Sequence, residues 1–331
     1  MAQPLLTGHN LALGYPGRPK PKVVLENLNL ALRPGQLVAM LGPNGVGKST
    51  LLRTLAGLQV PLSGEVRLDD APIQDYSPLE RARKLSMVLT EPIQGGNLRV
   101  QELVALGRFP HTGWSGRMSS EDQDRVQAAI DACRIGYLAQ ERISEISDGQ
   151  RQKAMIARAL AQDGPIMLLD EPTAHLDLPN KGEIMHLLHE LARKQNKAVL
   201  VSTHDLHLAL HMADRLWLVD CVAPLEEGLP EDLMLQGRVA RLFDHPQFAL
   251  DDNTGQYRLK PSEGTPIQIT GPEPARQWVA QALTKRGFKE SDQASAQVTI
   301  SGISNQWTFS YGNATVSTVA ELVSLVTTAP Q

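Results

Sequence analysis

The chain has 331 residues, 42% of them hydrophobic, which is enough for one large domain with a real core and a second, smaller one. Its formal net charge is −4 with acidic and basic residues interspersed, which argues against nucleic acid or an anionic lipid surface as the main partner. The N-terminus has no basic segment followed by an apolar core, and no apolar run approaches the roughly 18 residues of a spanning helix. We therefore expect a globular protein that is cytosolic or peripheral to a membrane.

The first motif along the chain is a phosphate-binding loop. Residues 42–50 fit the pattern G-x-x-x-x-G-K-[ST] and lie between two apolar segments, 37–41 and 51–52, so we expect a strand, a loop and a helix. Backbone N–H groups of such a loop enclose phosphates, the lysine reaches the terminal phosphates, and the serine hydroxyl can bind Mg²⁺. A plain glycine turn is the alternative, which the Lys-Ser pair between strand and helix disfavours. The predicted nucleotide-binding residues are Gly42, Pro43, Asn44, Gly45, Val46, Gly47, Lys48, Ser49 and Thr50.

A helix with one apolar face is predicted after a short strand at 85–89. Val100, Leu103, Val104 and Leu106 recur at helical spacing, and Gly-Arg-Phe-Pro at 107–110 should end the helix and expose its aromatic ring. The apolar face is explained equally well by packing on its own domain or by a protein partner.

Another helix should begin near Ser147, which can act as its N-cap, while Gly149 leaves backbone N–H groups open to an anion. Taken alone, this segment is only a capped helix. It stands just ahead of an apolar strand at 165–169 that ends in Asp170 and Glu171. The C-terminal end of a buried parallel strand opens on ligands, so Asp170 is placed to hold Mg²⁺ and Glu171 to polarise an attacking water. An acidic helix cap is the alternative, which the phosphate loop makes the weaker reading.

In combination, these segments resemble the ATP-binding cassette family over about residues 5–233. The resemblance implies ATP and Mg²⁺ as cofactors and an ATPase that works as a head-to-tail dimer. In that dimer, each ATP lies between one phosphate loop and the signature segment of the second copy. The residues that would act across the dimer are Ser147, Asp148, Gly149 and Gln150 of the signature and Asp177 of the D-loop.

The resemblance also assigns roles to single residues. Tyr15 matches the aromatic that stacks on adenine, with an ordinary strand tyrosine as the alternative. His204, after an apolar strand at 198–202, matches the switch histidine that contacts the γ-phosphate, and it joins Glu171 as a catalytic residue. Mg²⁺ would be held by Ser49, Asp170 and Glu91, where Glu91 stands in place of the family's Q-loop glutamine.

Asp148 is a second departure from the family, because the signature normally has glycine at that position. A carboxylate near a phosphate is repulsive unless it points away or pairs with a neighbour such as Arg151.

The predicted fold class is α/β: a P-loop NTPase of the cassette type, with a RecA-like core, an antiparallel β subdomain and a helical subdomain. We place this domain at 5–236, its helical subdomain at about 92–162, a linker at 237–264 and a small C-terminal α+β domain at 265–331. In that last domain we expect strands at 266–270, 297–300 and 307–311, a final helix that ends at 326, and a helix at 273–286 whose apolar stripe contains Trp278, Val279, Ala282 and Leu283. The role of the domain stays open. Cys133 and Cys221 lack metal-ligand spacing and are expected to be buried and inert.

The features that the chain lacks, together with residues 102–111, limit the classes of cassette protein to which it can belong. There is no coiled-coil insertion, as in repair proteins, and only one phosphate loop, unlike translation-type members. The stretch Glu-Leu-Val-Ala-Leu-Gly-Arg-Phe-Pro-His resembles importers of ferric siderophore, haem and cobalamin. This implies separate permease subunits, a substrate-binding protein, and a location on the cytoplasmic face of the inner membrane, with membrane contact only through the permease. A soluble regulatory ATPase with a ligand-sensing C-terminal domain, or an exporter ATPase, is the alternative.

Overall fold

The computed structural model describes residues 2–18, 20–89, 97–113, 116–220, 224–251, 255, 257–260, 264–303 and 306–328. The chain forms two compact units, Met1–Phe243 and Asp244–Gln331, which are considered separately. No helix in these described ranges is both long and apolar enough to cross a membrane.

The first unit contains a six-stranded sheet whose central strands are buried on both faces. In spatial order its strands are β10 (Glu226–Gly228), β9 (Arg215–Leu218), β3 (Gln36–Leu41), β8 (Ala198–Ser202), β7 (Ile166–Asp170) and β6 (Leu85–Val88). All neighbouring pairs are parallel except β10 with β9. Strands β7 and β8 are apolar runs of five buried residues, as a parallel sheet covered on both sides requires.

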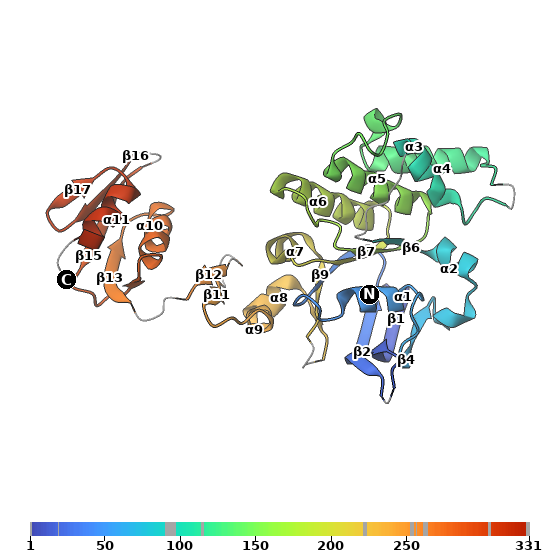
Figure 1. Cartoon of the computed structure of the whole chain (residues 1–331), viewed down its shortest axis with the longest axis horizontal. Helices are drawn as coiled ribbons and strands as arrows, with labels where there is room; N and C mark the ends of the chain where they lie inside the picture. The colour runs from blue at the N-terminus through green and yellow to red at the C-terminus, as the bar shows by residue number, and fades with distance from the viewer. Residues whose placement is uncertain are drawn as a thin grey trace. The chain divides into compact units, whose positions relative to one another are not determined.

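One side of this sheet faces a second, antiparallel sheet. Its strands, again in spatial order, are β2 (Lys22–Leu32), β1 (Leu6–Tyr15), β4 (Ser63–Leu68) and β5 (Ala71–Pro72). Helix α1 (Lys48–Leu55) lies between the two sheets (Figure 1) and contributes Leu51, Leu52 and Leu55 to their shared core. The hydrophobic effect of this common core fixes the phosphate loop, which joins β3 to α1, between the sheets.

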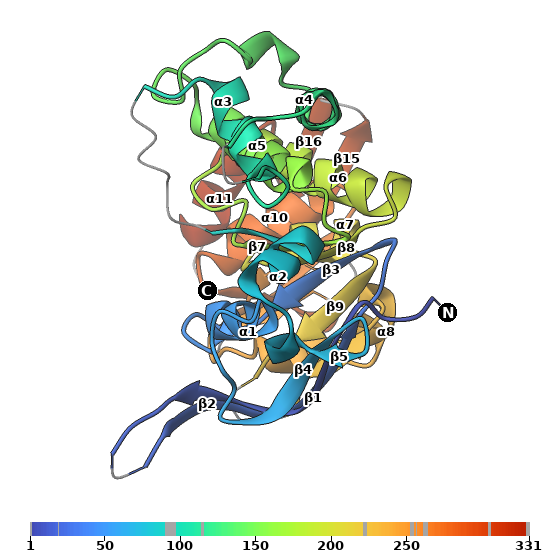
Figure 2. The same ribbon diagram turned by 90° about the vertical axis from the view of Figure 1, so that its right-hand side faces the viewer.

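The other side of the six-stranded sheet is covered by helices (Figure 2). Helices α5 (Asp148–Ala161), α6 (Leu178–Lys194) and α7 (Leu206–Met212) contact the sheet, and α3 (Val100–Ala105) and α4 (Ser120–Ala132) pack on α5. The one-turn 3₁₀ helices of this region are η2 (Leu106–Arg108) and η3 (Gly136–Leu138). The remaining short elements of the unit are η1 (Ile73–Asp75), α2 (Pro78–Lys84), α8 (Pro230–Leu235) and α9 (Arg238–Leu242).

The segment after α3 shows why Gly107 and Arg108 stand there. A Cβ atom on Gly107 would lie 2.1 Å from the carbonyl oxygen of Arg158 in α5, so only glycine permits this approach. Arg108 is buried and donates from Nε to Asp122 at 2.8 Å. Phe109 is exposed, as predicted, but Leu106 is 51% exposed and does not belong to the predicted apolar face. The chain tightens from α3 into η2 at Leu106, so the α-helical spacing that predicted a common face ends before this residue.

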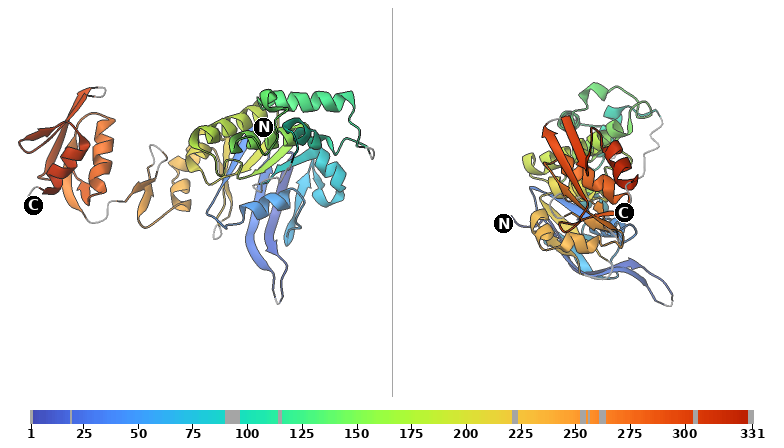
Figure 3. Two further views of the ribbon diagram at one scale, coloured as in Figure 1. Left: turned by 45° about the horizontal axis from the view of Figure 1, so that its top comes forward. Right: turned by 90° about the vertical axis from the view of Figure 1, so that its left-hand side faces the viewer.

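The second unit begins with a hairpin of β11 (Phe248–Leu250) and β12 (Tyr257–Leu259). It continues as a five-stranded sheet in the order β14 (Phe288–Glu290), β13 (Thr265–Thr270), β15 (Gln297–Ile303), β16 (Gln306–Tyr311) and β17 (Ala314–Val316). Helices α10 (Ala275–Thr284) and α11 (Val319–Thr328) share one core with one face of this sheet (Figure 3). The predicted cassette fold with an added α+β module is confirmed.

Three details of the chain after residue 236 differ from the prediction. Strands β14 and β17 were not predicted, and the range 237–264, predicted as a linker, contains α9 and the β11–β12 hairpin in its described part. Trp278, predicted in the apolar stripe of its helix, is 63% exposed. Helix α10 instead buries Ala275, Val279 and Leu283, which recur every four residues and leave Trp278 at the side.

Candidate functional site

The loop between β3 and α1 has the backbone of a phosphate-binding loop. Gly45 and Gly47 have φ angles of +77° and +115°, in the left-handed region that favours glycine. A Cβ atom at Gly47 would also lie 2.6 Å from Val24, so any side chain here would push the loop off strand β2. Helix α1 begins directly at Lys48, and its N-terminal N–H groups therefore open into the loop.

Lys48 is held inside this loop by its own backbone. Its Nζ atom donates to the carbonyl oxygens of Gly42 at 2.8 Å and Pro43 at 3.2 Å, and the side chain is buried. Burial lowers the pKa of the ammonium group, and the negative charges of Glu171 and Asp170 oppose that shift. The carboxylates at the end of β7 therefore lie close enough to the loop to act on its lysine.

The end of β7 is tied to the end of β8. The parallel register places Asp170 opposite Ser202, and the Ser202 hydroxyl donates to Asp170 Oδ1 at 2.6 Å. The same hydroxyl oxygen accepts the backbone N–H of Glu171 at 2.9 Å. Ser202 was not among the predicted site residues. A serine at the C-terminal end of an otherwise apolar strand is the pattern that could have predicted it.

Glu171 and His204 form a direct pair. The Nδ1 atom of His204 donates to Glu171 Oε2 at 2.8 Å, because an ionised carboxylate only accepts. Glu171 has a φ of +47°, an uncommon angle for a residue with a side chain. The carboxylate and imidazole that were predicted as catalytic from separate strand ends are thus within hydrogen-bonding distance.

Tyr15 reaches the same region from the end of β1. Its hydroxyl lies 3.2 Å from the Thr50 hydroxyl in α1, and about half of the side chain is exposed. An exposed ring anchored beside the phosphate loop is suited to stacking on a base.

The predicted signature residues lie at the start of α5. Ser147 caps the helix by accepting the Gln150 N–H at 3.3 Å, while the Gln150 side chain accepts the Ser147 N–H at 2.9 Å. Gly149 packs on α6, because a Cβ atom there would lie 2.9 Å from the Asn180 side chain. Within the described ranges, no hydrogen bond joins residues 147–150 to the loop at 42–50.

Asp148 pairs with Arg151, which was one of the two arrangements that would relieve its repulsion. Its Oδ1 atom accepts from Arg151 Nη1 at 2.9 Å. Arg151 also donates to the carbonyl oxygens of Ile146 and Ile143, so it braces the turn that precedes the helix.

Asp177 has a structural contact of its own, since it caps α6 by accepting the Asn180 N–H at 3.0 Å. Glu91, predicted as a Mg²⁺ ligand, lies outside the described residues. A further contact that sequence analysis missed is the ion pair of Lys181 with Asp205, the cap of α7, at 3.2 Å. It ties α6 to the segment that carries His204.

The ligand set suits Mg²⁺ together with a nucleotide. No group of three or more His, Cys, Asp or Glu side chains in the described ranges could hold a metal by itself. The Ser49 hydroxyl and the Asp170 carboxylate could each supply an oxygen ligand, and Mg²⁺ is commonly held by one or two protein groups together with substrate phosphates.

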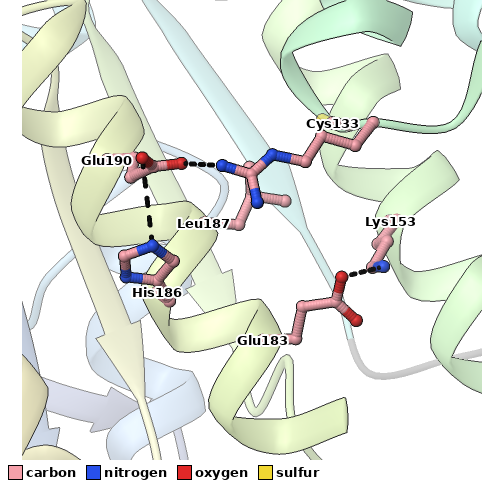
Figure 4. Close-up of a pocket in the computed structure, with 7 residues that line it drawn as sticks. Cys133, Lys153, Glu183, His186, Leu187 and Glu190 are labelled. Carbon is pink, nitrogen blue, oxygen red and sulfur yellow. Dashed lines mark hydrogen bonds and ion pairs between the residues drawn. The ribbon is translucent and has the colours of Figure 1, made fainter.

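A small pocket beside α6 is lined by residues that form ion pairs (Figure 4). Lys153 pairs with Glu183 at 2.5 Å and Arg134 with Glu190 at 2.9 Å. Cys133 lines this pocket, and burial raises the pKa of its thiol to about 12. The expectation of a buried cysteine is confirmed for Cys133, while Cys221 lies outside the described residues.

Two family models match the chain. The model described as "ABC transporter" matches residues 25–174, and the model described as "Iron ABC transporter C-terminal domain" matches residues 264–327.

Curated relatives match over most of the cassette. The ferric enterobactin transport ATP-binding protein FepC of Escherichia coli is 38% identical over 80% of this chain and 93% of its own. A probable siderophore transport ATP-binding protein of Bacillus subtilis, YusV, is 36% identical over 81% of this chain and 94% of its own. A hemin import ATP-binding protein of Nocardia farcinica is 37% identical over 69% of this chain and 78% of its own.

Solved structures give the same result. An inward-facing metal-chelate type ABC transporter matches with a TM-score of 0.64 and 28% identity, over 77% of this chain and 96% of that one. A dimeric bacterial ABC transporter cassette matches with a TM-score of 0.58 and 30% identity, over 68% of this chain and 98% of that one. Fold, loop geometry and relatives agree, and the chain belongs to the ATP-binding proteins of ABC transporters, the ATPases that drive these transporters.

Proposed function

We propose that this protein hydrolyses ATP with Glu171 as the group that polarises the attacking water, and that it does so as the motor of an iron-chelate importer. The observation that carries the first part is the hydrogen bond of 2.8 Å between Glu171 and His204. It joins a carboxylate at the end of β7 to a partly exposed imidazole, next to the loop that holds Lys48.

In this proposal, each residue has one task. The loop at 42–50 binds the phosphates of ATP through its N–H groups, and Lys48 exchanges its carbonyl contacts for the terminal phosphates. Glu171 accepts a proton from water, and His204 orients that carboxylate and contacts the γ-phosphate. Ser49, Asp170 and Glu91 would hold Mg²⁺, which would supply positive charge to the phosphates of ATP.

The site is completed by a second copy of the chain. Ser147, Asp148, Gly149 and Gln150 stand at a helix start without a hydrogen bond to the loop of their own chain in the described ranges. The dimeric structure of a similar cassette supports a dimer. In the head-to-tail arrangement that we propose, this helix start, together with Asp177, faces the ATP of the partner. Tyr15 then stacks on adenine in the copy that supplies the loop.

The cargo we propose is an iron chelate, either a ferric siderophore or haem, with cobalamin as the further option implied by sequence resemblance. Relatives named for ferric enterobactin, siderophore and hemin transport support it, as does the match of residues 264–327 to the iron ABC transporter C-terminal domain. Separate permease subunits and a substrate-binding protein would carry the cargo. This chain would touch the cytoplasmic face of the membrane only through the permease.

Replacement of Glu171 by glutamine tests the catalytic proposal. Glutamine cannot take up a proton, so we expect ATP binding to persist while turnover falls by about 100-fold or more, the range of general-base catalysis. Glu65→Gln is the matched control, since Glu65 lies in β4 and its ion pair in the described part of the chain is with Arg67. Normal turnover in Glu171→Gln would contradict the proposal.

Uptake and co-purification test the importer proposal. A strain that lacks the gene should lose uptake of one labelled cargo among ferric siderophore, haem and cobalamin, and the wild-type gene but not the Glu171→Gln gene should restore it. A permease should co-purify with the protein from detergent-solubilised membranes. If the uptake of all three cargoes is unchanged and no permease co-purifies, a soluble regulatory ATPase becomes the better explanation.

A further inference from the structure

Ser202 is the polar end of an otherwise apolar strand. Strand β8 reads Ala-Val-Leu-Val-Ser, every residue of it is buried, and the Ser202 side chain is 0% exposed. A buried hydroxyl must find partners within the protein. Its partners are two residues that the proposed function places at the reacting phosphate.

The Ser202 hydroxyl acts both as a hydrogen-bond donor and as an acceptor. It donates to Asp170 Oδ1 at 2.6 Å, a short bond of the charge-assisted kind, and it accepts the backbone N–H of Glu171 at 2.9 Å. A single oxygen atom therefore links the side chain of one acidic residue to the main chain of the next.

The Glu171 backbone needs such support. Its φ of +47° lies in the left-handed region, where a residue with a side chain is strained unless its surroundings hold it. That turn aims the Glu171 carboxylate at His204. Without the bond from its N–H, the peptide of Glu171 could relax, and the carboxylate would leave its place.

We propose that Ser202 is a positioning residue for ATP hydrolysis, which fixes the Asp170 carboxylate for Mg²⁺ and the Glu171 backbone for the attack of water. This inference rests on the proposed roles of Asp170 and Glu171. Ser202 itself is buried beneath both of them.

A purely structural role for the hydroxyl predicts a different outcome. In that case, removal of the hydroxyl would lower the thermal midpoint and leave the kinetics of the folded protein unchanged. Ser86 supplies the comparison, because it is a buried serine in β6 of the same sheet and its hydroxyl donates to the Ile166 carbonyl oxygen at 3.3 Å. Ser86→Ala should therefore change stability alone.

The experiment measures kcat, KM for ATP, the Mg²⁺ concentration for half-maximal activity and the thermal midpoint of the full-length chain. Ser202→Ala should lower kcat by about ten-fold, the effect of one hydrogen bond in the transition state. It should also raise the half-maximal Mg²⁺ concentration several-fold and leave ATP affinity within about two-fold, because Lys48 and the loop are untouched. Ser202→Thr, which keeps the hydroxyl, should recover most of the activity.

Three results would overturn the inference. The first is a Ser202→Ala protein with kcat and Mg²⁺ dependence within about two-fold of wild type. The second is a loss of kcat that Ser86→Ala matches. The third concerns Ser202→Cys, which is used if the threonine variant does not fold. Cysteine is of similar size but a weak donor, so this variant should behave like Ser202→Ala. Wild-type activity in Ser202→Cys would show that the hydroxyl is dispensable.

Glu171→Gln in the same assay separates the two proposals. If Glu171→Gln abolishes turnover and Ser202→Ala does not lower it, only the inference about Ser202 fails. If Glu171→Gln hydrolyses ATP like the wild type, the proposed function fails and the inference about Ser202 fails with it.

Discussion

The pair of Asp148 and Arg151 offers a direct test of the proposed head-to-tail dimer. Asp148 Oδ1 accepts from Arg151 Nη1 at 2.9 Å, and the two side chains are 68% and 30% exposed. Arg151→Gln removes the positive charge, keeps a polar side chain in α5 and leaves Asp148 as an uncompensated anion at the start of that helix.

The expected cost differs between the single chain and the dimer. In the single chain, an exposed pair contributes only about 0.2–1 kcal/mol, so the thermal midpoint should hardly move. In the proposed dimer, the freed carboxylate would approach the triphosphate of the partner copy. Two like unit charges at about 6 Å, with an effective dielectric constant of about 20, repel by about 3 kcal/mol, which is roughly a 100-fold weaker association.

The assay is ATP-dependent dimerisation, followed by analytical ultracentrifugation in a Glu171→Gln background that is expected to retain ATP. Arg151→Gln should weaken the dimer by about 10- to 100-fold, and less so at high salt. Arg142→Gln is the matched control, since Arg142 is also an exposed arginine in an i,i+3 pair, with Glu145 at 3.9 Å. It should have little effect.

The double variant Asp148→Gly/Arg151→Gln isolates the electrostatic part. Removal of both charges should restore most of the association, and any remaining deficit reports the contacts of Arg151 with the carbonyl oxygens of Ile143 and Ile146. If Arg151→Gln dimerises as tightly as the parent, or if the double variant is no better than the single one, Asp148 does not face the phosphates.

Three further predictions concern single groups. Lys48→Ala should weaken ATP binding by about 10- to 100-fold, the worth of a hydrogen bond to a charged group, as measured with a fluorescent ATP analogue. Hydrogen bonds from Ser119, with Arg108 beside it, lower the pKa of Asp122 to about 2 from its usual 3.8. Its stabilisation is therefore complete above pH 4 and lost as the pH falls toward 2, so Asp122→Asn should cost about 1–2 kcal/mol in urea unfolding at pH 7 and progressively less in acid. Maleimide labelling with mass spectrometry should find Cys133 unmodified at pH 8 in the native protein and modified in urea, because burial raises the pKa of its thiol.

Local patterns in the sequence were sufficient for the parts of the site that lie on continuous segments. The strand ending in Asp170 and the strand before His204 were each visible as an apolar run, and the structure gives them as Ile166–Asp170 and Ala198–Ser202. The phosphate loop follows from its glycines and lysine in the same way. Each of these patterns is contained within about ten residues. The structure that it predicts depends on local backbone conformation and not on distant contacts.

Contacts that depend on register or helical phase could not be predicted in this way. The bond from Ser202 to Asp170 exists because β7 and β8 pair in one register, and a slip of one residue would turn the serine to the opposite face. Trp278 and Leu106 were expected on the apolar faces of their helices, and they lie exposed for a related reason. The residues of α10 that are buried are those that pack on the sheet of the same unit. Leu106 lies in the 3₁₀ turn η2, next to the close approach of Gly107 to α5.

The cap of α5 shows how one helix start can serve its own chain and still be available to another. The capping box satisfies the N–H groups of Ser147 and Gln150 and uses the Ser147 oxygen only as an acceptor. Among the described residues, the hydroxyl proton of Ser147 has no acceptor, and the N–H groups of Asp148 and Gly149, at the first two helical positions, are among those that a helix cannot satisfy internally. In the proposed dimer, these three donors would form the anion site offered to the partner's ATP. With Arg151 neutralising the adjacent carboxylate, aspartate can stand where the family has glycine without closing that site to phosphate.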